Sequence, residues 1–148
     1  EIGGEIMCRG TKEGGTPWRT AIEHPAVEVY ERKLYAVAEV PNTAIATSGN
    51  YRNYYVRNGR KMVHTIDPKT GYPVMHALLS ATVFAETCMI ADAYATAFMV
   101  MGLEKATHII NSNEKISAYL IYEDEPGAIA TFVSSDIEKA IKLIDVED

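Results

Sequence analysis

The residues best suited to chemistry lie between His64 and Thr96. The run HTIDPKTGYP carries an imidazole, a carboxylate, a lysine and a threonine hydroxyl around a Pro-Lys-Thr-Gly sequence that is typical of a tight turn. Further along the chain, Asp92 and Thr96 are four positions apart, which on a helix places both side chains on one face. A carboxylate oxygen and a hydroxyl oxygen stacked in this way can both reach one hard cation such as Mg²⁺.

Each of these residues also has a purely structural interpretation. Asp92 could be an acid favoured by the dipole at the start of a helix, and Thr96 could bond back to the preceding helical turn. His64 could be a structural histidine at a strand end, and Asp67 could serve only to form the turn before proline. Lys69 could meet a phosphate or simply be a solvated turn lysine. On an otherwise apolar helix, Asp92 and Thr96 together favour the cation site.

Hydrophobic patterning predicts the elements that position these residues. Apolar residues at helical spacing predict a helix over 89–101, capped by Thr87 and ended by Gly102. The continuous apolar run 77–85 predicts a central strand. Asn58-Gly59, between two alternating runs, predicts a β-hairpin whose second strand delivers His64. TSGNYRN at 47–53 follows a strand, and its small residues allow backbone N–H groups to turn toward an anion or simply form a corner.

The rest of the chain reads as short strands and two further helices. Strands are expected at 5–8, 17–25, 34–40, 43–47, 115–122 and 128–133, with a helix over 103–111 and an acidic turn before the last strand. Ser135 and Glu138 form a capping-box pattern, and Ile137, Ala140, Ile141 and Ile144 lie on one helical stripe. We therefore expect a C-terminal helix that docks on a sheet.

Composition limits the classes of partner. The chain has 148 residues, 47% of them hydrophobic, which suits one globular unit. Its net charge of −6 and the lack of a Lys/Arg cluster make nucleic acid and anionic membrane surfaces poor partners. No apolar run approaches the roughly 18 residues that span a bilayer. Cys8 and Cys88 are far apart in sequence and are expected to be two separate buried thiols.

Several motifs, taken together, resemble the FAD:protein FMN transferases, the ApbE family. They are TSGNY at 47–51, HTIDPKTGYP at 64–73, and ADAYATA at 91–97 followed by MG at 101–102. GGEI at 3–6 and PW at 17–18 fit the same order. The resemblance covers nearly the whole chain, and the combination H-x-x-D-P-x-T-G with A-D-x-x-A-T is specific. Asn50 departs from the pattern, which commonly has an acid at that position.

The resemblance implies an α+β fold with a mixed, largely antiparallel sheet and packed helices, ApbE-like and related to the T-fold. Members of the family are longer and carry a further flavin and metal motif before the Gly-Gly strand. The chain begins at Glu1 with no match to that motif. We therefore expect 1–148 to be the C-terminal part of a single flavin transferase domain, incomplete at its N-terminus.

The resemblance also implies an activity and a site. The family moves FMN from FAD onto a threonine hydroxyl of an acceptor flavoprotein, releases AMP and uses Mg²⁺. It implies His64 as the catalytic base and Asp92 and Thr96 as metal ligands, with a third protein ligand upstream. The residues expected to contact the flavin nucleotide are Thr47, Ser48, Gly49, His64, Ile66 and Asp67, with Ile66 acting through its backbone and Asp67 as an orienter.

Location, partners and alternatives follow from the same resemblance. Family members are usually exported to the periplasm, often as lipid-anchored proteins, and modify subunits of membrane redox complexes. Two alternatives stay open. Water could replace the threonine hydroxyl, giving a hydrolase that splits FAD into FMN and AMP, or the chain could bind a flavin without turnover. The same side chains would serve the transferase and the hydrolase, so the sequence does not separate them.

Overall fold

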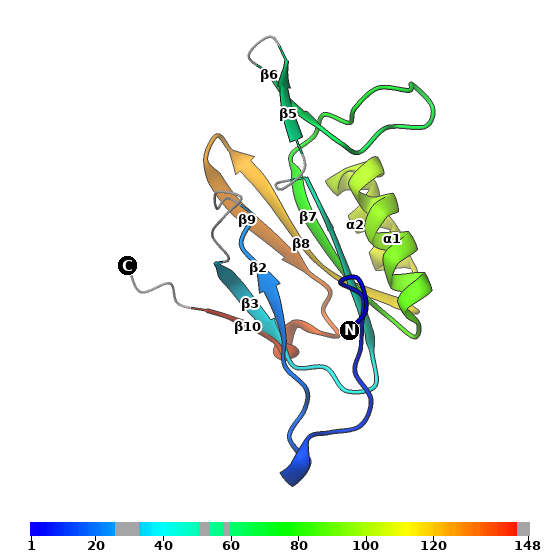
Figure 1. Cartoon of the computed structure of the whole chain (residues 1–148), viewed down its shortest axis with the longest axis vertical. Helices are drawn as coiled ribbons and strands as arrows, with labels where there is room; N and C mark the ends of the chain where they lie inside the picture. The colour runs from blue at the N-terminus through cyan, green and yellow to red at the C-terminus, as the bar shows by residue number, and fades with distance from the viewer. Residues whose placement is uncertain (26–32, 51–53, 58–59, 145–148) are drawn as a thin grey trace.

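Two helices and two sheets form three layers in the computed structural model, which describes residues 1–25, 33–50, 54–57 and 60–144 (Figure 1). The helices α1 (Cys88–Met101) and α2 (Leu103–Ser112) cover one face of a five-stranded sheet, and a three-stranded sheet lies against its other face. The α+β fold agrees with the prediction. The predicted hairpin turn at 58–59 and residues 51–53 of the TSGNYRN run lie outside the described residues.

The central sheet has the strand order β1-β4-β7-β8-β9. Its strands are β1 (Ile6–Met7), β4 (Ala44–Gly49), β7 (Leu78–Ala85), β8 (Ile116–Glu125) and β9 (Ala128–Val133), and every pair in it is antiparallel. β7 lies in the middle and is buried along nearly its whole length, as its continuous apolar run predicts. β8 continues further into the expected acidic turn, because Glu123 and Glu125 still pair with β9.

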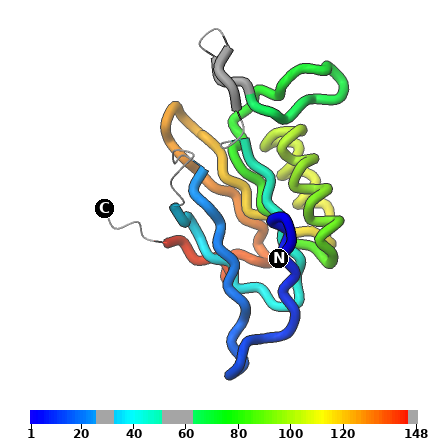
Figure 2. The backbone as a smooth tube through the Cα atoms, in the orientation of Figure 1, coloured from blue at the N-terminus to red at the C-terminus, as the bar shows by residue number. Residues whose placement is uncertain are grey.

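A smaller sheet and a hairpin complete the strands. β2 (Thr20–Glu23), β3 (Leu34–Ala38) and β10 (Ile141–Leu143) form the second sheet in the order β10-β3-β2. β5 (Tyr54–Arg57) and β6 (Arg60–Val63) pair antiparallel in the predicted hairpin. Figure 2 shows that the chain after β6 loops out on the side of the sheet that carries the helices before it enters β7. Two short 3₁₀ turns, η1 (Glu13–Gly15) and η2 (Glu138–Ala140), are the remaining elements of the described ranges.

The predicted C-terminal helix is wrong. Within the described residues, which end at 144, this segment forms the single turn η2 without a side-chain cap and then enters β10. β10 pairs with the edge of β3, where Ile144 N–H donates to the Tyr35 carbonyl at 3.0 Å and Lys142 Nζ donates to Glu39 Oε2 at 2.6 Å. Without β10, this edge of β3 would have unpaired backbone groups. The hydrogen bonds that β10 makes there outweigh the local helical pattern, because isoleucine is also common in strands.

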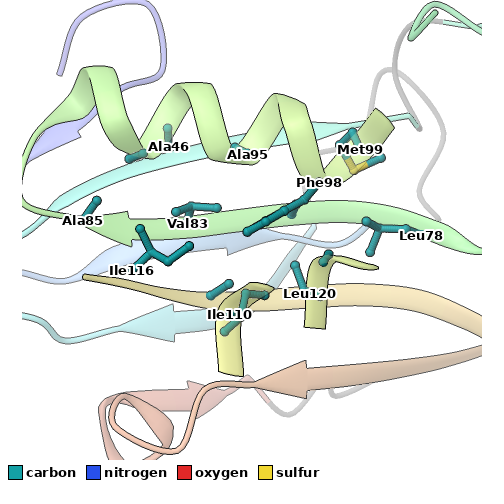
Figure 3. Packing of buried hydrophobic residues seen from close by; sticks show 14 residues of the cluster. Ala46, Leu78, Val83, Ala85, Ala95, Phe98, Met99, Ile110, Ile116 and Leu120 are labelled. Atoms are coloured by element: carbon teal, nitrogen blue, oxygen red, sulfur yellow. The ribbon is translucent and has the colours of Figure 1, made fainter. Parts of the chain in front are cut away.

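Two hydrophobic cores meet at the central sheet, because successive residues of a strand point to opposite faces. Val83 packs toward the helices and Phe84 toward the second sheet. Figure 3 shows Phe98 of α1 lying over β7, between Val83 and Leu78. The small residues Ala91 and Ala95 of α1 are fully buried, which lets the helix approach β4 and β7 closely. No helix of the described residues is long and apolar enough to cross a membrane.

The ends of α1 follow the predicted caps. Thr87 Oγ1 accepts a hydrogen bond from Ile90 N–H at 3.3 Å. At the other end Gly102 has φ 79° and ψ 174°, a conformation that is essentially restricted to glycine. Because the helix begins at Cys88, Asp92 lies beyond its first turn. The first-turn dipole interpretation of Asp92 therefore does not hold.

Candidate active site

A cleft of about 1280 Å³ runs along β4 and brings together most of the predicted site residues. β1 pairs with β4 only at Ala44 and Ile45, and the cleft opens beyond that short pairing. Its lining includes the predicted residues Thr47, Ser48, Gly49, His64, Asp92 and Thr96. The predicted convergence of the imidazole with the two oxygen-bearing side chains of α1 is therefore present. Their chemical roles stay predictions.

The α1 wall of the cleft carries Asp92 and Thr96. Both side chains are exposed, one helical turn apart, while Ala91 and Ala95 beside them are fully buried. The Thr96 hydroxyl lies 3.2 Å from the Ser48 hydroxyl, within hydrogen-bonding distance. The hydrogen bond found for Thr96 thus joins α1 to the end of β4.

The β4 wall presents two faces of one strand. Ser48 points toward α1, whereas the neighbouring Thr47 points to the other face, where its hydroxyl lies 2.9 Å from the Thr82 hydroxyl. Both residues line the cleft. The cleft therefore wraps around the free edge of β4, and a bound molecule would contact hydroxyl groups on both sides of that edge.

His64 reaches the cleft from the end of the hairpin, one residue after β6, and its side chain is exposed. The next residue, Thr65, also lines the cleft, and its hydroxyl donates to Asn50 Oδ1 at 3.1 Å. On the backbone side, Val74 N–H donates to the Thr65 carbonyl at 3.0 Å. The histidine is therefore next to a residue that hydrogen bonds hold from two directions.

The turn that follows uses Asp67 as a structural residue. Asp67 Oδ1 accepts from Lys69 N–H at 2.8 Å, and its carbonyl accepts from Gly71 N–H at 2.8 Å. Gly71 has φ 74°, which favours glycine. Ile66 pairs with Pro73 across this turn. Ile66, Asp67 and Lys69 are not among the described residues that line the cleft, so the structure does not bring them together with the other predicted contacts.

Sequence reasoning gave no function to three residues that shape the site. Asn50 was noted only as a departure from a motif. Trp18 lines the cleft with 42% of its surface exposed, and its indole N–H donates to the Arg9 carbonyl at 2.9 Å. His76 has no partner pattern in the sequence. Its Nε2 lies 2.8 Å from the Met99 carbonyl, so this nitrogen carries the proton and the end of the loop is bonded to α1. The sequence signals among these are the PW motif for Trp18 and the TSGNY motif for Asn50.

The cleft carries charges of both signs. Its carboxylates are those of Glu1, Glu5, Glu23 and Asp92, and Arg19 supplies a guanidinium. Arg19 Nε also lies 3.3 Å from Glu39 Oε1. The hydrogen bond from Lys142 is the main reason that the pKa of Glu39 is lowered, with a smaller contribution from the charge of Arg19. The ion pair therefore holds the Arg19 guanidinium beside the cleft.

The donor set of α1 fits a cation shared with a phosphate. Asp92 and Thr96 offer two oxygens to the cleft, and oxygen is the ligand type that Mg²⁺ prefers. The described part of the chain contains no cluster of three or more His, Cys, Asp or Glu side chains suited to a metal ion. A magnesium ion at this position would therefore take further oxygens from a substrate, from water or from other protein groups.

Sequence comparisons assign this chain to a known family. The model of the ApbE family matches residues 1–120. The chain is 43% identical over 129 residues to a FAD:protein FMN transferase of Haemophilus influenzae, covering 87% of this chain and 37% of that protein. It is 42% identical over 123 residues to the protein of the same name from Escherichia coli, covering 83% of this chain and 34% of that protein. The chain thus spans little more than a third of these relatives.

Solved structures show the same fold. The chain matches the apo flavinyl transferase ApbE of Pseudomonas stutzeri with a TM-score of 0.75 and 36% identity, covering 95% of this chain and 42% of that one. It matches the flavin transferase ApbE of Vibrio cholerae with a TM-score of 0.75 and 38% identity, covering 95% and 43%. The three-layer arrangement of helices and sheets is therefore shared with flavin transferases.

Proposed function

Since this chain belongs to the ApbE family, we propose that its protein is a Mg²⁺-dependent FAD:protein FMN transferase. It moves the FMN part of FAD onto a threonine hydroxyl of an acceptor flavoprotein and releases AMP. The names of the relatives support flavin transfer. The observation that carries the proposal for this chain is that His64, Asp92 and Thr96 line one cleft although they come from a hairpin end and a separate helix.

In the proposed reaction, the threonine oxygen of the acceptor forms a bond to the phosphorus attached to riboflavin. The bond from that phosphorus to the bridging oxygen breaks, and AMP leaves with this oxygen. His64 takes the proton of the threonine hydroxyl, since a neutral imidazole is a suitable base near neutral pH. Ser48 orients Thr96 through their hydrogen bond. The hydroxyl of Thr47 and the backbone at Gly49 bind the nucleotide along the β4 edge.

Asp92 and Thr96 would hold the magnesium ion. When bound, the ion neutralises negative charge on the diphosphate as the transfer proceeds. The family resemblance also implies a backbone contact from Ile66, which lies in the neighbouring turn outside the cleft lining and pairs there with Pro73. In the same turn, Asp67 fixes the loop that follows His64. These assignments extend the family resemblance to individual residues of this chain.

The acceptor and the location are proposed from the family alone. We expect a flavoprotein subunit of a membrane redox complex as the acceptor. We expect export to the periplasm and lipid anchoring of the protein. Detection of the protein in a periplasmic membrane fraction would support this location, and its recovery only from the cytosol would contradict it.

The function is tested by incubating the intact protein with FAD, Mg²⁺ and a threonine-containing acceptor. Transfer gives an acceptor whose mass increases by that of FMN less one water, because the threonine oxygen replaces an oxygen of the phosphate, together with free AMP. Hydrolysis gives free FMN and AMP with unlabelled acceptor. Binding without turnover leaves intact FAD. An acceptor in which valine replaces the threonine is the control, because it keeps the side-chain shape and removes the attacking oxygen.

A further inference from the structure

A buried amide joins three segments at the edge of the cleft. Asn50 directly follows β4 and is 5% exposed. Its Nδ2 donates to the Leu78 carbonyl at 3.4 Å, and its backbone N–H donates to the Leu79 carbonyl at 2.9 Å. Its Oδ1 accepts from the Thr65 hydroxyl at 3.1 Å. The end of β4, the start of β7 and the segment that begins at His64 therefore meet at one side chain.

We infer that Asn50 is a positioning residue that sets the place of His64 by holding the Thr65 hydroxyl. Thr65 is bonded on its other side to Val74, so its backbone and its side chain are both held. Because His64 directly precedes Thr65, the path of its backbone is constrained by these bonds. This inference rests on the proposed role of His64 as the base of the transfer reaction.

The residue type matters at this position. An amide supplies a donor and an acceptor at once, and the two contacts of the Asn50 side chain use both. A carboxylate supplies acceptors only, so it would meet the Leu78 carbonyl with like partial charge. A small apolar side chain would leave the partly buried Thr65 hydroxyl and the Leu78 carbonyl without this partner, which is unfavourable for both groups.

Thr65→Val and Asn50→Ala test the inference in the intact protein. Each change removes the bridge, and a small displacement of a catalytic group can lower the rate about 100-fold. We expect kcat for flavin transfer to fall by about 10-fold to 100-fold, while KM for FAD changes little. Thr65→Ser keeps the hydroxyl and should restore kcat.

Ser134→Ala is the matched control. Ser134 is 6% exposed, its Oγ accepts from Ala118 N–H at 2.7 Å, and it does not line the cleft. Its loss should lower stability and leave kcat unchanged. The inference is overturned if Thr65→Val keeps the wild-type kcat, or if Thr65→Ser is as slow as Thr65→Val. If Asn50→Ala does not fold, the two Thr65 variants decide, since they differ in the hydroxyl group.

A second measurement separates this inference from the proposed function. In histidine-labelled protein, the NMR resonances of the His64 ring should shift in Thr65→Val and Asn50→Ala and stay in place in Ser134→Ala. Unchanged ring resonances in the bridge variants would overturn the positioning role. If the wild-type protein transfers no flavin, the proposed function fails, and the resonances alone still decide whether Asn50 positions His64.

Discussion

The hydroxyls of Ser48 and Thr96 lie 3.2 Å apart across 48 positions of sequence. Each hydroxyl comes from a residue that has a buried alanine near it on the same element. Ala46 lies two positions before Ser48 on the same face of β4, and Ala95 directly precedes Thr96 on α1. Packing of the alanines brings the two backbones close, and the hydroxyls then meet at the rim. At the scale of single residues, the site is therefore a consequence of how small apolar neighbours pack.

Asp92→Asn tests the proposed cation site. The amide keeps the size of the side chain and removes the negative charge, so Mg²⁺-dependent flavin transfer should fall about 100-fold, as when one preorganised electrostatic group is lost. Because Asp92 is exposed, the free energy of unfolding should change by less than about 0.5 kcal/mol. The measurements are the transfer rate as a function of Mg²⁺ concentration and a urea unfolding curve.

Glu104→Gln is the control for this change, because Glu104 is an exposed acid on α2 that does not line the cleft. Its rate and its response to Mg²⁺ should match those of the wild type. An undiminished Mg²⁺ response in Asp92→Asn would remove Asp92 from the site.

Gly102→Ala should destabilise the junction of α1 and α2. The backbone there has φ 79°, and an added Cβ would lie 3.2 Å from His76 Cδ2. Backbone strain alone costs about 1–3 kcal/mol, and the contact with His76 adds to it. Gly127→Ala is the control, since Gly127 has φ 82° with nothing within 4 Å of the added atom. Chemical unfolding should show a larger loss for Gly102→Ala, and equal losses would exclude the contact.

At the scale of elements, α1 carries the site only because it lies close to β4 and β7. Ala95→Leu should therefore act on both stability and activity. Ala95 is fully buried, and the larger side chain overpacks the core at a cost of about 1–3 kcal/mol. It would also lift α1 from the sheet and separate Thr96 from Ser48, so flavin transfer should slow.

Ala93→Leu is the matched control, because Ala93 is exposed on the same helix. Its free energy of unfolding and its transfer rate should stay near the wild-type values. Equal effects of the two leucines, measured by urea unfolding and by flavin transfer, would show that close packing of α1 is not what places Thr96.

The elements that the sequence predicts well are those fixed by local chemistry. Thr87 and Gly102 mark the two ends of α1. The apolar run marks the bounds of β7 almost to the residue. The last segment was mispredicted, since Ile141 and Ile144 suit a helix stripe and a strand equally, and the choice depends on the free edge of β3. The local pattern of apolar residues does not show that this segment pairs with a strand distant in sequence.

The same limit applies to the candidate site. The motif resemblance led to His64, Asp92 and Thr96, and the structure places them in one cleft. The motif resemblance did not predict the hydrogen bond between Asn50 and Thr65. The two residues are on different segments, and the spacing of residues in a sequence does not show which distant side chains bond to one another. Roles that depend on a third segment are therefore visible only in the folded chain.

At the scale of the whole molecule, the central sheet has a core on each face, and Tyr119 lies in the core between the two sheets. The side chain is 2% exposed, and burial raises the pKa of Tyr119 to about 12. An ordinary tyrosine titrates near pH 10. Between these two values the unfolded chain loses the phenol proton and the folded chain keeps it, so stability is fully present below about pH 10 and falls as the pH rises toward 12.

Tyr119→Phe should remove this alkaline loss. For a shift from about 10 to about 12, the wild-type protein should lose on the order of 1 kcal/mol of unfolding free energy by pH 11 through this group. The phenylalanine variant keeps the ring in the core and has no proton to lose, so its curve should be flatter over this range. Urea unfolding at a series of pH values from 9 to about 11 measures the difference. Parallel curves for the two proteins would mean that the phenol of Tyr119 reaches solvent and that the interface between the sheets is open at this point.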